Sequence, residues 1–316
     1  MEKKKQHTVP RSYLENFTDE KGMVWVLAEE ASANKVFKSA PKNLLTGNHF
    51  YTIEFDKGGT PFIIEDTLAN IEGRFATIFH EKISQELPLT LEERACVSIF
   101  VGTLLFRTKK IRESMRQGFV SLERQMEEWR KQFEVMSPKA REAASRISPP
   151  TNGQSFTQDD VKNAIENIDD IHSSMLIENL PEIASLIFDM GWGVITPEDS
   201  SDEFITSDHP VSMLRPDSIR KYGPDAFGSI PGLIYKDVEI SLPLSPKLVL
   251  FMGWQIQESN QYYVPMPSSF VEQLNLRTII QSREKIVASS ERQINKIKGW
   301  IQELERQYPR KVESSD

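Results

Sequence analysis

Apolar residues recur at every third or fourth position between residues 61 and 86, and this period predicts an amphipathic helix. The positions that carry the pattern are Ile64, Leu68, Ile71, Phe75 and Ile78. The sequence Thr-Leu-Glu-Glu from Thr90 matches a capping box, so a second helix should begin near residue 91 and run toward 136. Its first half is apolar and its second half is charged and periodic.

Shorter helices are expected at residues 10–17, where Pro10 suits the first helical position, and at 157–178 and 180–190. Residues 137–155 mix helix formers with Pro and Gly, so their second part should be a flexible connection. The pattern from 268 to about 308 returns to helix. There Ile294, Ile297, Ile301 and Leu304 have heptad-like spacing, but over only about two heptads, which favours packing on the protein's own core over dimerisation.

Strand-like runs rich in β-branched and aromatic residues lie at 23–29 and 48–55. A short turn of helix or a loop should separate them. Between 191 and 253, short apolar runs alternate with Pro, Gly, Asp and Ser, which is typical of an antiparallel sheet. Residues 212–236 are rich in Gly and Pro and are expected to form a long loop.

This order of elements predicts an α+β fold: a helical region and a mostly antiparallel β-sheet, closed by a long C-terminal helix. We expect one domain over residues 1–290. A mostly helical insert would occupy about 61–190 and a β-rich part about 191–265, with a C-terminal helix extension at 291–316.

The composition limits the classes of protein. The chain has 316 residues and a formal net charge of −8, which disfavours nucleic-acid binding over the whole surface but allows a local basic groove. The single cysteine, Cys96, excludes an intramolecular disulfide and should be a small buried apolar residue. The apolar run 97–106 is too short to span a bilayer, and no secretory signal follows Lys3–Lys5. A cytoplasmic protein that does not enter a membrane is therefore expected.

Several common catalytic motifs are missing. The chain contains no phosphate-binding Walker loop, no Gly-x-Gly-x-x-Gly, no Gly-x-Ser-x-Gly and no His-Glu-x-x-His. This argues against P-loop NTPases, dinucleotide enzymes and ordinary serine hydrolases. A divalent metal ion stays possible only if distant segments supply its ligands.

Two charged residues interrupt apolar helix faces. Glu72 lies between Leu68 and Phe75, and Arg107 lies between Leu104 and Ile111. Because an isolated buried charge is costly, each should be paired. They can pair with each other as a structural bridge, or they can line a cleft in which Arg107 binds a phosphate or carboxylate.

Two further groups are candidates for chemistry. Asp208 ends a strand-like run just before His209 and Pro210, where it can cap a turn, orient a histidine or bind a metal. His7 precedes the first helix. It can act as a general base or metal ligand together with Asp208 and Glu72, or its ring can hold the N-terminal segment in place.

A basic stretch follows Arg107 and includes Lys109, Lys110, Arg112 and Arg116. It can bind the phosphates of a nucleic acid, or it can be the solvated face of a helix.

Several pieces of the chain resemble the widespread, mostly bacterial family described as domain of unknown function 4238. Its members begin His-x-Val-Pro-x-x-Tyr-Leu-x-x-Phe, which matches His7, Val9, Pro10, Tyr13, Leu14 and Phe17. The next similar pieces are Val24–Val26, Pro41–Asn43 and the pair Phe50 and Tyr51. Later pieces are Phe204–Val211 and Leu242–Pro246. The resemblance covers about residues 6–290 and implies a setting among mobile or defence-associated genes, without implying a reaction.

Two functions follow from these features. The first is a nuclease-like phosphodiester hydrolase, with His7, Asp208 and Glu72 as catalytic groups and Arg107, Lys109, Lys110 and Arg112 on the phosphate. The alternative is a non-catalytic sensor or interaction module with a protein partner or a second copy, in which the polar residues are structural.

Overall fold

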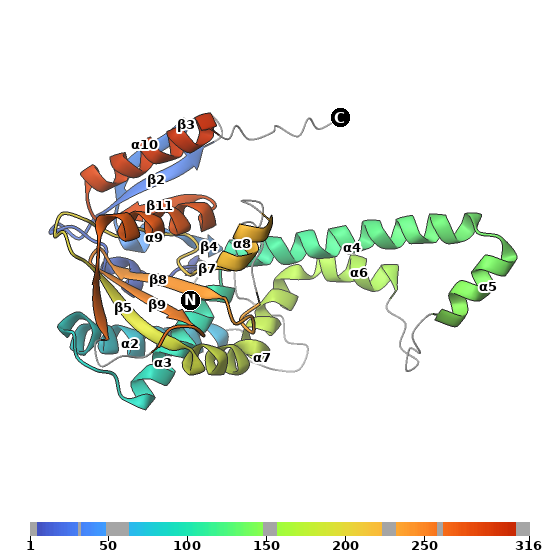
Figure 1. Cartoon of the computed structure of the whole chain (residues 1–316), viewed down its shortest axis with the longest axis horizontal. Helices are drawn as coiled ribbons and strands as arrows, with labels where there is room; N and C mark the ends of the chain where they lie inside the picture. Colours follow the sequence, from blue (N-terminus) through green and yellow to red (C-terminus); the bar gives the residue numbers. More distant parts are fainter. Residues whose placement is uncertain are drawn as a thin grey trace.

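The computed structural model describes residues 5–30, 33–48, 63–147, 157–222, 232–257 and 262–307. Figure 1 shows a body of sheets and helices from which a helical arm projects. The arm comprises α4 (Lys109–Val135), α5 (Pro138–Ile147) and α6 (Gln158–Glu166). The protein is α+β, as the sequence predicts, and most of its strand pairs are antiparallel.

The larger sheet has five strands in the order β10 (Tyr263–Met266), β5 (Gly191–Pro197), β9 (Leu248–Gly253), β8 (Glu239–Ser245) and β7 (Ser212–Leu214). Its β10–β5 pair is parallel and its other pairs are antiparallel. Both faces of the central strands are buried, so alternate residues enter different cores: Val194 and Leu250 on one side, Ile195 and Val249 on the other.

The smaller sheet has the order β3 (Ala33–Ser39), β2 (Val24–Glu30), β11 (Lys285–Ala288) and β6 (Thr206–Ser207). The expectation of continuous helix from 268 to 308 is therefore wrong. The chain forms α9 (Ser268–Gln281), then β11, then α10 (Glu291–Gln307). The apolar run Ile286–Ala288 is too short to be assigned by periodicity alone, and pairing with β2 and β6 makes it a strand.

The first long helix, α2 (Ile63–Glu81), is followed by a 3₁₀ turn at Ile83–Gln85. The predicted capping box is present: Thr90 Oγ1 accepts from Glu93 N, and Glu93 Oε2 accepts from Thr90 N. The helix that it starts, α3 (Leu91–Phe106), ends earlier than predicted, and α4 begins only at Lys109. Near the end of the insert, α7 (Ile168–Asp189) continues through Pro181, so the predicted break at 178–180 lies instead at Asn167.

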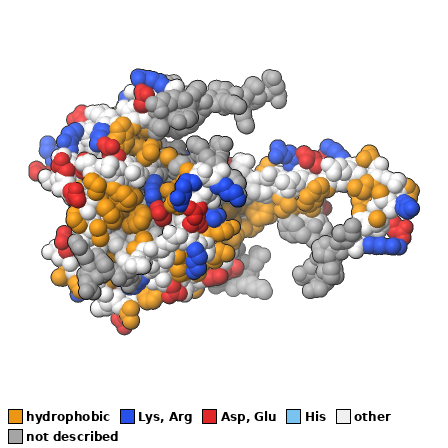
Figure 2. All heavy atoms as spheres, viewed as in Figure 1, with side chains coloured by type: hydrophobic (Ala, Val, Ile, Leu, Met, Phe, Trp, Pro, Cys, Tyr) orange, Lys and Arg blue, Asp and Glu red, His pale blue; other side chains and the backbone are white. Residues whose placement is uncertain are grey.

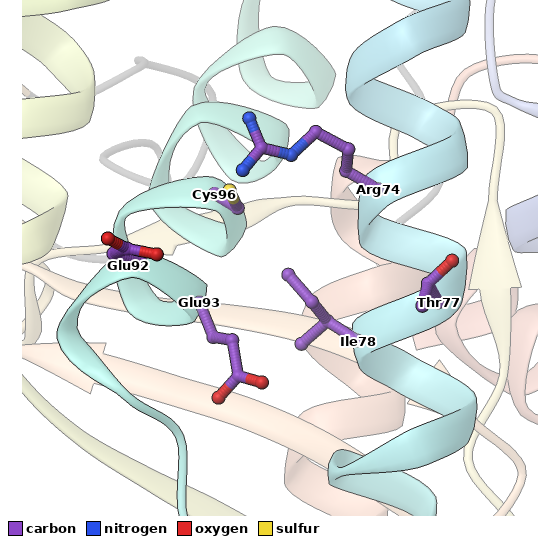
Figure 3. A pocket seen from close by; sticks show the side chains of 6 residues that line it. All are labelled: Arg74, Thr77, Ile78, Glu92, Glu93 and Cys96. Carbon is purple, nitrogen blue, oxygen red and sulfur yellow. The ribbon is translucent and has the colours of Figure 1, made fainter.

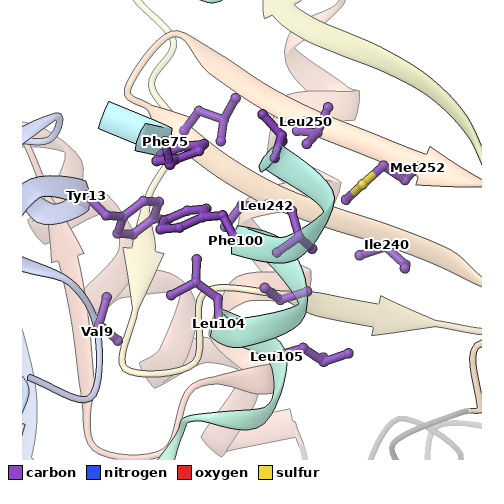
Figure 4. Packing of buried hydrophobic residues seen from close by; sticks show 14 of the residues in the cluster. Val9, Tyr13, Phe75, Phe100, Leu104, Leu105, Ile240, Leu242, Leu250 and Met252 are labelled. Carbon is purple, nitrogen blue, oxygen red and sulfur yellow. The ribbon is translucent and has the colours of Figure 1, made fainter. Parts of the chain in front are cut away.

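The main core joins the four- and five-stranded sheets to α2, α3 and α7. Figure 4 shows part of it, with Phe75 and Phe100 packed beside Leu242 and Leu250 of the larger sheet. Phe75 of α2 stacks on Phe100 of α3 with ring centroids 3.6 Å apart. Tyr13, from α1 (Arg11–Glu15), enters the same core, where its hydroxyl donates to Pro243 O at 2.5 Å and lies 2.7 Å from Thr206 Oγ1. The N-terminal signature is thus a core element.

The C-terminal helix closes the smaller sheet. Ile294 and Ile297 of α10 are fully buried against Leu27, Ile205 and Ile286. The prediction that this helix packs on its own domain is confirmed.

The structure has short elements in the two remaining regions, residues 41–48 and 212–222. A 3₁₀ turn forms at Pro41–Asn43, and β4 (Thr46–Asn48) pairs with β1 (Lys5–His7). The predicted strand 48–55 lies almost wholly outside the described residues. The expected loop at 212–236 instead contains β7 and α8 (Pro216–Tyr222), and its residues 223–231 lie outside the described residues. In the described part of the chain, helices that are both long and apolar enough for a bilayer do not occur.

Candidate functional site

The junction between α3 and α4 (residues 106–110) gathers most of the predicted site residues. Arg107 ends α3, and Thr108 adopts extended geometry with φ −91° and ψ 153° before α4 starts. Thr108 occupies the cap position of α4, but its side chain makes no capping hydrogen bond there. Each of the five junction residues instead bonds to the body of the protein.

Arg107 is the most buried charged residue of the junction, with 3% of its surface exposed. Its guanidinium donates to Glu72 Oε1 at 2.6 Å and to the backbone carbonyl of His7 at 2.6 Å. The expected pairing of Glu72 and Arg107 across two helices is therefore present, and it also holds the N-terminal strand. A planar fork with several donors suits this double contact.

The ring of His7 lies in the same group but does not bond to Arg107. Burial lowers the pKa of His7, and the nearby Glu72 carboxylate opposes that shift. Its Nε2 is buried without a hydrogen-bond partner among the described residues. A neutral ring is expected near pH 7, because its burial outweighs the attraction of Glu72.

Thr108 connects the junction to His209. Thr108 Oγ1 lies 2.8 Å from His209 Nδ1, and both residues are buried. Desolvation lowers the pKa of His209 to about 3, and the charge of Lys110 adds to the effect. The ring is therefore neutral at physiological pH and serves as a hydrogen-bond partner rather than a cation.

Asp208 faces the loop between α9 and β11. Its two carboxylate oxygens accept from the backbone N–H groups of Arg283 and Glu284, at 3.0 and 2.9 Å, and its own N–H donates to Lys285 O. Burial raises the pKa of Asp208, and these backbone donors oppose the shift. The carboxylate thus fastens one loop to another.

The two lysines of the junction reach this loop and the end of α9 that precedes it. Lys109 Nζ pairs with Glu284 Oε2 at 3.1 Å, and Lys110 Nζ donates to the backbone and side-chain oxygens of Gln281. Burial lowers the pKa of Lys110 to about 8, although the Asp208 charge favours its protonated form. The predicted basic residue Arg112 points elsewhere, toward Asp169 at 3.1 Å.

Sequence reasoning found no role for His172, which completes the junction. His172 Nε2 lies 2.7 Å from Phe106 O, one of the carbonyls that α3 leaves without a helical partner. Desolvation lowers its pKa to about 4. Threonine is common at the start of helices, so Thr108 is the local signal for a break between α3 and α4. No local pattern indicates that His172 or Gln281 contacts the junction.

The predicted residues therefore fall into two groups. His7, Glu72 and Arg107 form one, and Asp208, Lys109 and Lys110 form the other, with Thr108 and His209 beside the second. Within the described part of the chain, no hydrogen bond or ion pair joins Asp208 to His7 or Glu72. Clusters of three or more His, Cys, Asp or Glu side chains able to hold a metal are also absent from the described residues.

A separate shallow pocket of about 220 Å³ opens between α2 and α3 (Figure 3). It is lined by Arg74, Thr77, Ile78, Glu92, Glu93 and Cys96, and it contains none of the predicted site residues. Cys96 is half-buried, which is less than expected, and packs against the main core.

The comparison with known families assigns the chain. The family described as protein of unknown function (DUF4238) matches residues 5–292. The chain belongs to the DUF4238 family. The match includes the N-terminal motif from His7 to Phe17 and the later piece Phe204–Val211, and it ends within the first residues of α10. No curated protein and no solved structure matches significantly.

Proposed function

We propose that this DUF4238 protein is a non-catalytic interaction module. Its polar signature residues hold the junction, at the base of the arm, to the body. The arm carries the surface that binds a partner. The observation that supports this most strongly is the use of the predicted acid Asp208 and the predicted phosphate ligand Arg107 in structural contacts. Asp208 accepts from two backbone N–H groups, and Arg107 bonds to Glu72 and to a backbone carbonyl.

A rigid junction would keep the binding surface of the arm in a fixed orientation relative to the body. Residues 106–110 bond to α7, α2, β1, the turn after β6, and the end of α9 with its following loop. These contacts fix the direction in which α4 leaves the body (Figure 1). Hydrogen bonds from several elements to one short segment restrict how that segment can move.

The test measures both the melting temperature and the cleavage activity of the Asp208→Asn variant. Asp208→Asn replaces one of the two acceptor oxygens by a donor that faces a backbone N–H, so the melting temperature should fall by several degrees. The control Asp217→Asn, on the exposed side of α8, should leave it unchanged. A stable Asp208→Asn protein that has lost a measurable cleavage activity would refute the proposal.

A phosphodiester hydrolase is the second candidate, because Lys110 has a lowered pKa and lies near both Asp208 and His209. Such a lysine could hold a phosphate next to an acid, with a divalent ion supplied from solution. This nuclease-like function would fit a bacterial defence or mobile-element setting and would act on nucleic acid. It predicts cleavage of single-stranded DNA or RNA with Mg²⁺ or Mn²⁺, reduced in Lys110→Met. Full cleavage by a folded His7→Ala protein would exclude the role assigned to His7.

The cytoplasmic location predicted from the sequence belongs to the same proposal. Cell fractionation that recovers the chain with the membranes would contradict it.

A further inference from the structure

Two serines at the β7 edge of the larger sheet are buried without hydrogen-bond partners. Ser212 of β7 lies directly opposite Ser241 of β8 in the antiparallel register, and each is 1% exposed. Neither hydroxyl has a hydrogen-bond partner among the described residues. Leaving a buried hydroxyl unpartnered is costly, so two such groups side by side indicate a bound partner.

Both serines face α9. Ser241 is also the register partner of Phe251 on β9, and the side chains of register partners lie on the same face of a sheet. Phe251 packs against the buried cluster that contains Val271 and Leu274 of α9. Ser212 shares this face because it is paired with Ser241, so both hydroxyls lie in the layer between the sheet and α9.

Arg277 of α9 brings a third buried donor to this layer. One of its terminal nitrogens, Nη2, donates to Glu239 Oε2 at 2.7 Å. The other, Nη1, is buried and has no hydrogen-bond partner among the described residues. Glu239 lies two residues before Ser241 on the same face of β8, and the guanidinium carbon of Arg277 lies 5.5 Å from the centre of the Phe251 ring. The guanidinium therefore lies over two neighbours of Ser241.

The surroundings of Arg277 supply donors rather than acceptors. Charged side chains cover much of the visible surface of the protein, where water can hydrate them (Figure 2). The Arg277 side chain is only 13% exposed, and its acid partner Glu239, at 32%, bonds to Nη2 alone. Gln281, one turn further along α9, is already occupied, since its Nε2 donates to Met213 O. The two hydroxyls and Nη1 thus have no acceptor among the described residues.

Three donors without an acceptor define what can bind. A guanidinium N–H can only donate, which disfavours a metal cation, and each serine hydroxyl can turn to donate. Directly opposite side chains on neighbouring strands have Cβ atoms about 4.5–5.5 Å apart, so one acceptor atom between the serines is within reach of both. A water molecule can accept from only two donors, whereas a halide ion can accept from all three. The positive charge of Arg277 strengthens its bond to an anion.

We propose that a chloride ion binds between β7, β8 and α9, held by the hydroxyls of Ser212 and Ser241 and by Nη1 of Arg277. A phosphate or sulfate would bring four oxygens, and three donors would leave some of them buried and unpartnered. The chloride ion ties the edge strand β7 to β8 and to α9, so it should stabilise the folded chain. This site lies in the body and needs no partner, so it goes beyond the interaction role above.

The experiment is thermal unfolding of the full chain, followed by circular dichroism, in mixtures of sodium chloride and sodium gluconate at constant ionic strength. Between about 2 and about 200 mM chloride, a dissociation constant of about 10 mM would raise the native melting temperature by about 3 °C. Ser212→Ala and Ser241→Ala should each lose most of this rise. In gluconate they should melt no lower than the native chain, because each removes a buried unpartnered hydroxyl. The matched control is Ser98→Ala, at a buried serine whose hydroxyl donates to Arg94 O, and it should keep the full response.

A second measurement locates the ion. In crystals grown with bromide in place of chloride, anomalous scattering should show a peak between Ser212, Ser241 and Arg277 that is absent from Ser241→Ala crystals. A melting temperature that does not respond to chloride would overturn the proposal. A native-like response in both alanine variants, or a water molecule without bromide at that position, would overturn it as well. These readouts do not depend on Asp208 or on cleavage, so failure here is distinct from failure of the interaction role.

Discussion

Removing Arg107 gives the sharpest test of the view that the junction is structural. In Arg107→Met the side chain keeps much of its length but loses its charge and donors. Glu72 then loses its partner, and the carbonyl of His7 loses a donor. Hydrogen bonds to charged groups contribute about 1.5–3 kcal/mol each, and breaking a buried ion pair costs about 3–5 kcal/mol.

The solvent exposure of Arg107 and Glu72 narrows the expected loss of unfolding free energy in Arg107→Met. Arg107 is 3% exposed, but Glu72 is 21% exposed, so water can reach the carboxylate that remains. We therefore expect a loss near the lower limit, about 3 kcal/mol in the free energy of unfolding. Glu72→Gln should cost less, about 1–2 kcal/mol, because Arg107 keeps the His7 carbonyl and a neutral amide oxygen can still accept.

The double variant measures the coupling directly. Independent effects would add to about 4–5 kcal/mol, whereas a shared contact should leave the double variant near 3 kcal/mol, a coupling of about 1–2 kcal/mol. The measurement is urea unfolding followed by tryptophan fluorescence and circular dichroism. The control is the exposed helix pair Arg146 and Glu142, where the same substitutions should change stability by about 0.5 kcal/mol or less. A cost below 1 kcal/mol for Arg107→Met, or no coupling, would refute the reasoning.

Further predictions concern the core, the buried histidines and two glycines. Tyr13→Phe should cost about 2 kcal/mol, because Pro243 O and Thr206 Oγ1 lose a buried partner, while Tyr235→Phe at the surface should cost almost nothing in the same unfolding assay. The folded pKa values of His209 and His172 are lowered from 6.5 to about 3 and about 4, so their contribution to stability is complete above pH 6.5 and is lost as the pH falls below it. Unfolding between pH 7 and 4.5 should show stability falling by up to about 1.4 kcal/mol per pH unit for each ring, less steeply in His209→Gln, and an equal slope in that variant would contradict the assignment. Gly191→Ala should lower the melting temperature strongly, because a Cβ there would lie 2.8 Å from the carbonyl carbon of Ile256, whereas Gly299→Ala in α10 has open space and should add up to about 1 kcal/mol.

Local patterns predicted much of the fold because they report local physics. The apolar period of α2, the capping box at Thr90 and the short apolar runs of β5, β8 and β9 each depend on neighbours in the chain. Local patterns do not predict the strand β11, because its four residues become a strand only through pairing with β2 and β6. The helix break at Thr108 is not predicted for a similar reason. The Thr108 side chain makes no capping hydrogen bond within its own helix, and it contacts His209, which is 101 residues away in the sequence.

The features of the candidate site also divide into those that the sequence determines and those that depend on tertiary contacts. The sequence alone determined which charges had to find partners, because Glu72 and Arg107 interrupt apolar stripes and an unpaired buried charge is too costly to persist. It also determined family membership through the N-terminal signature, and the α+β class through the order of its periodic segments. Only the tertiary structure decided that Asp208 binds the backbone of the α9–β11 loop, that His7 and Asp208 belong to different groups, and that Trp129 of α4 stays exposed. These outcomes depend on contacts between residues dozens to hundreds of positions apart, and hydrophobic period and residue type carry no information about which distant segments meet.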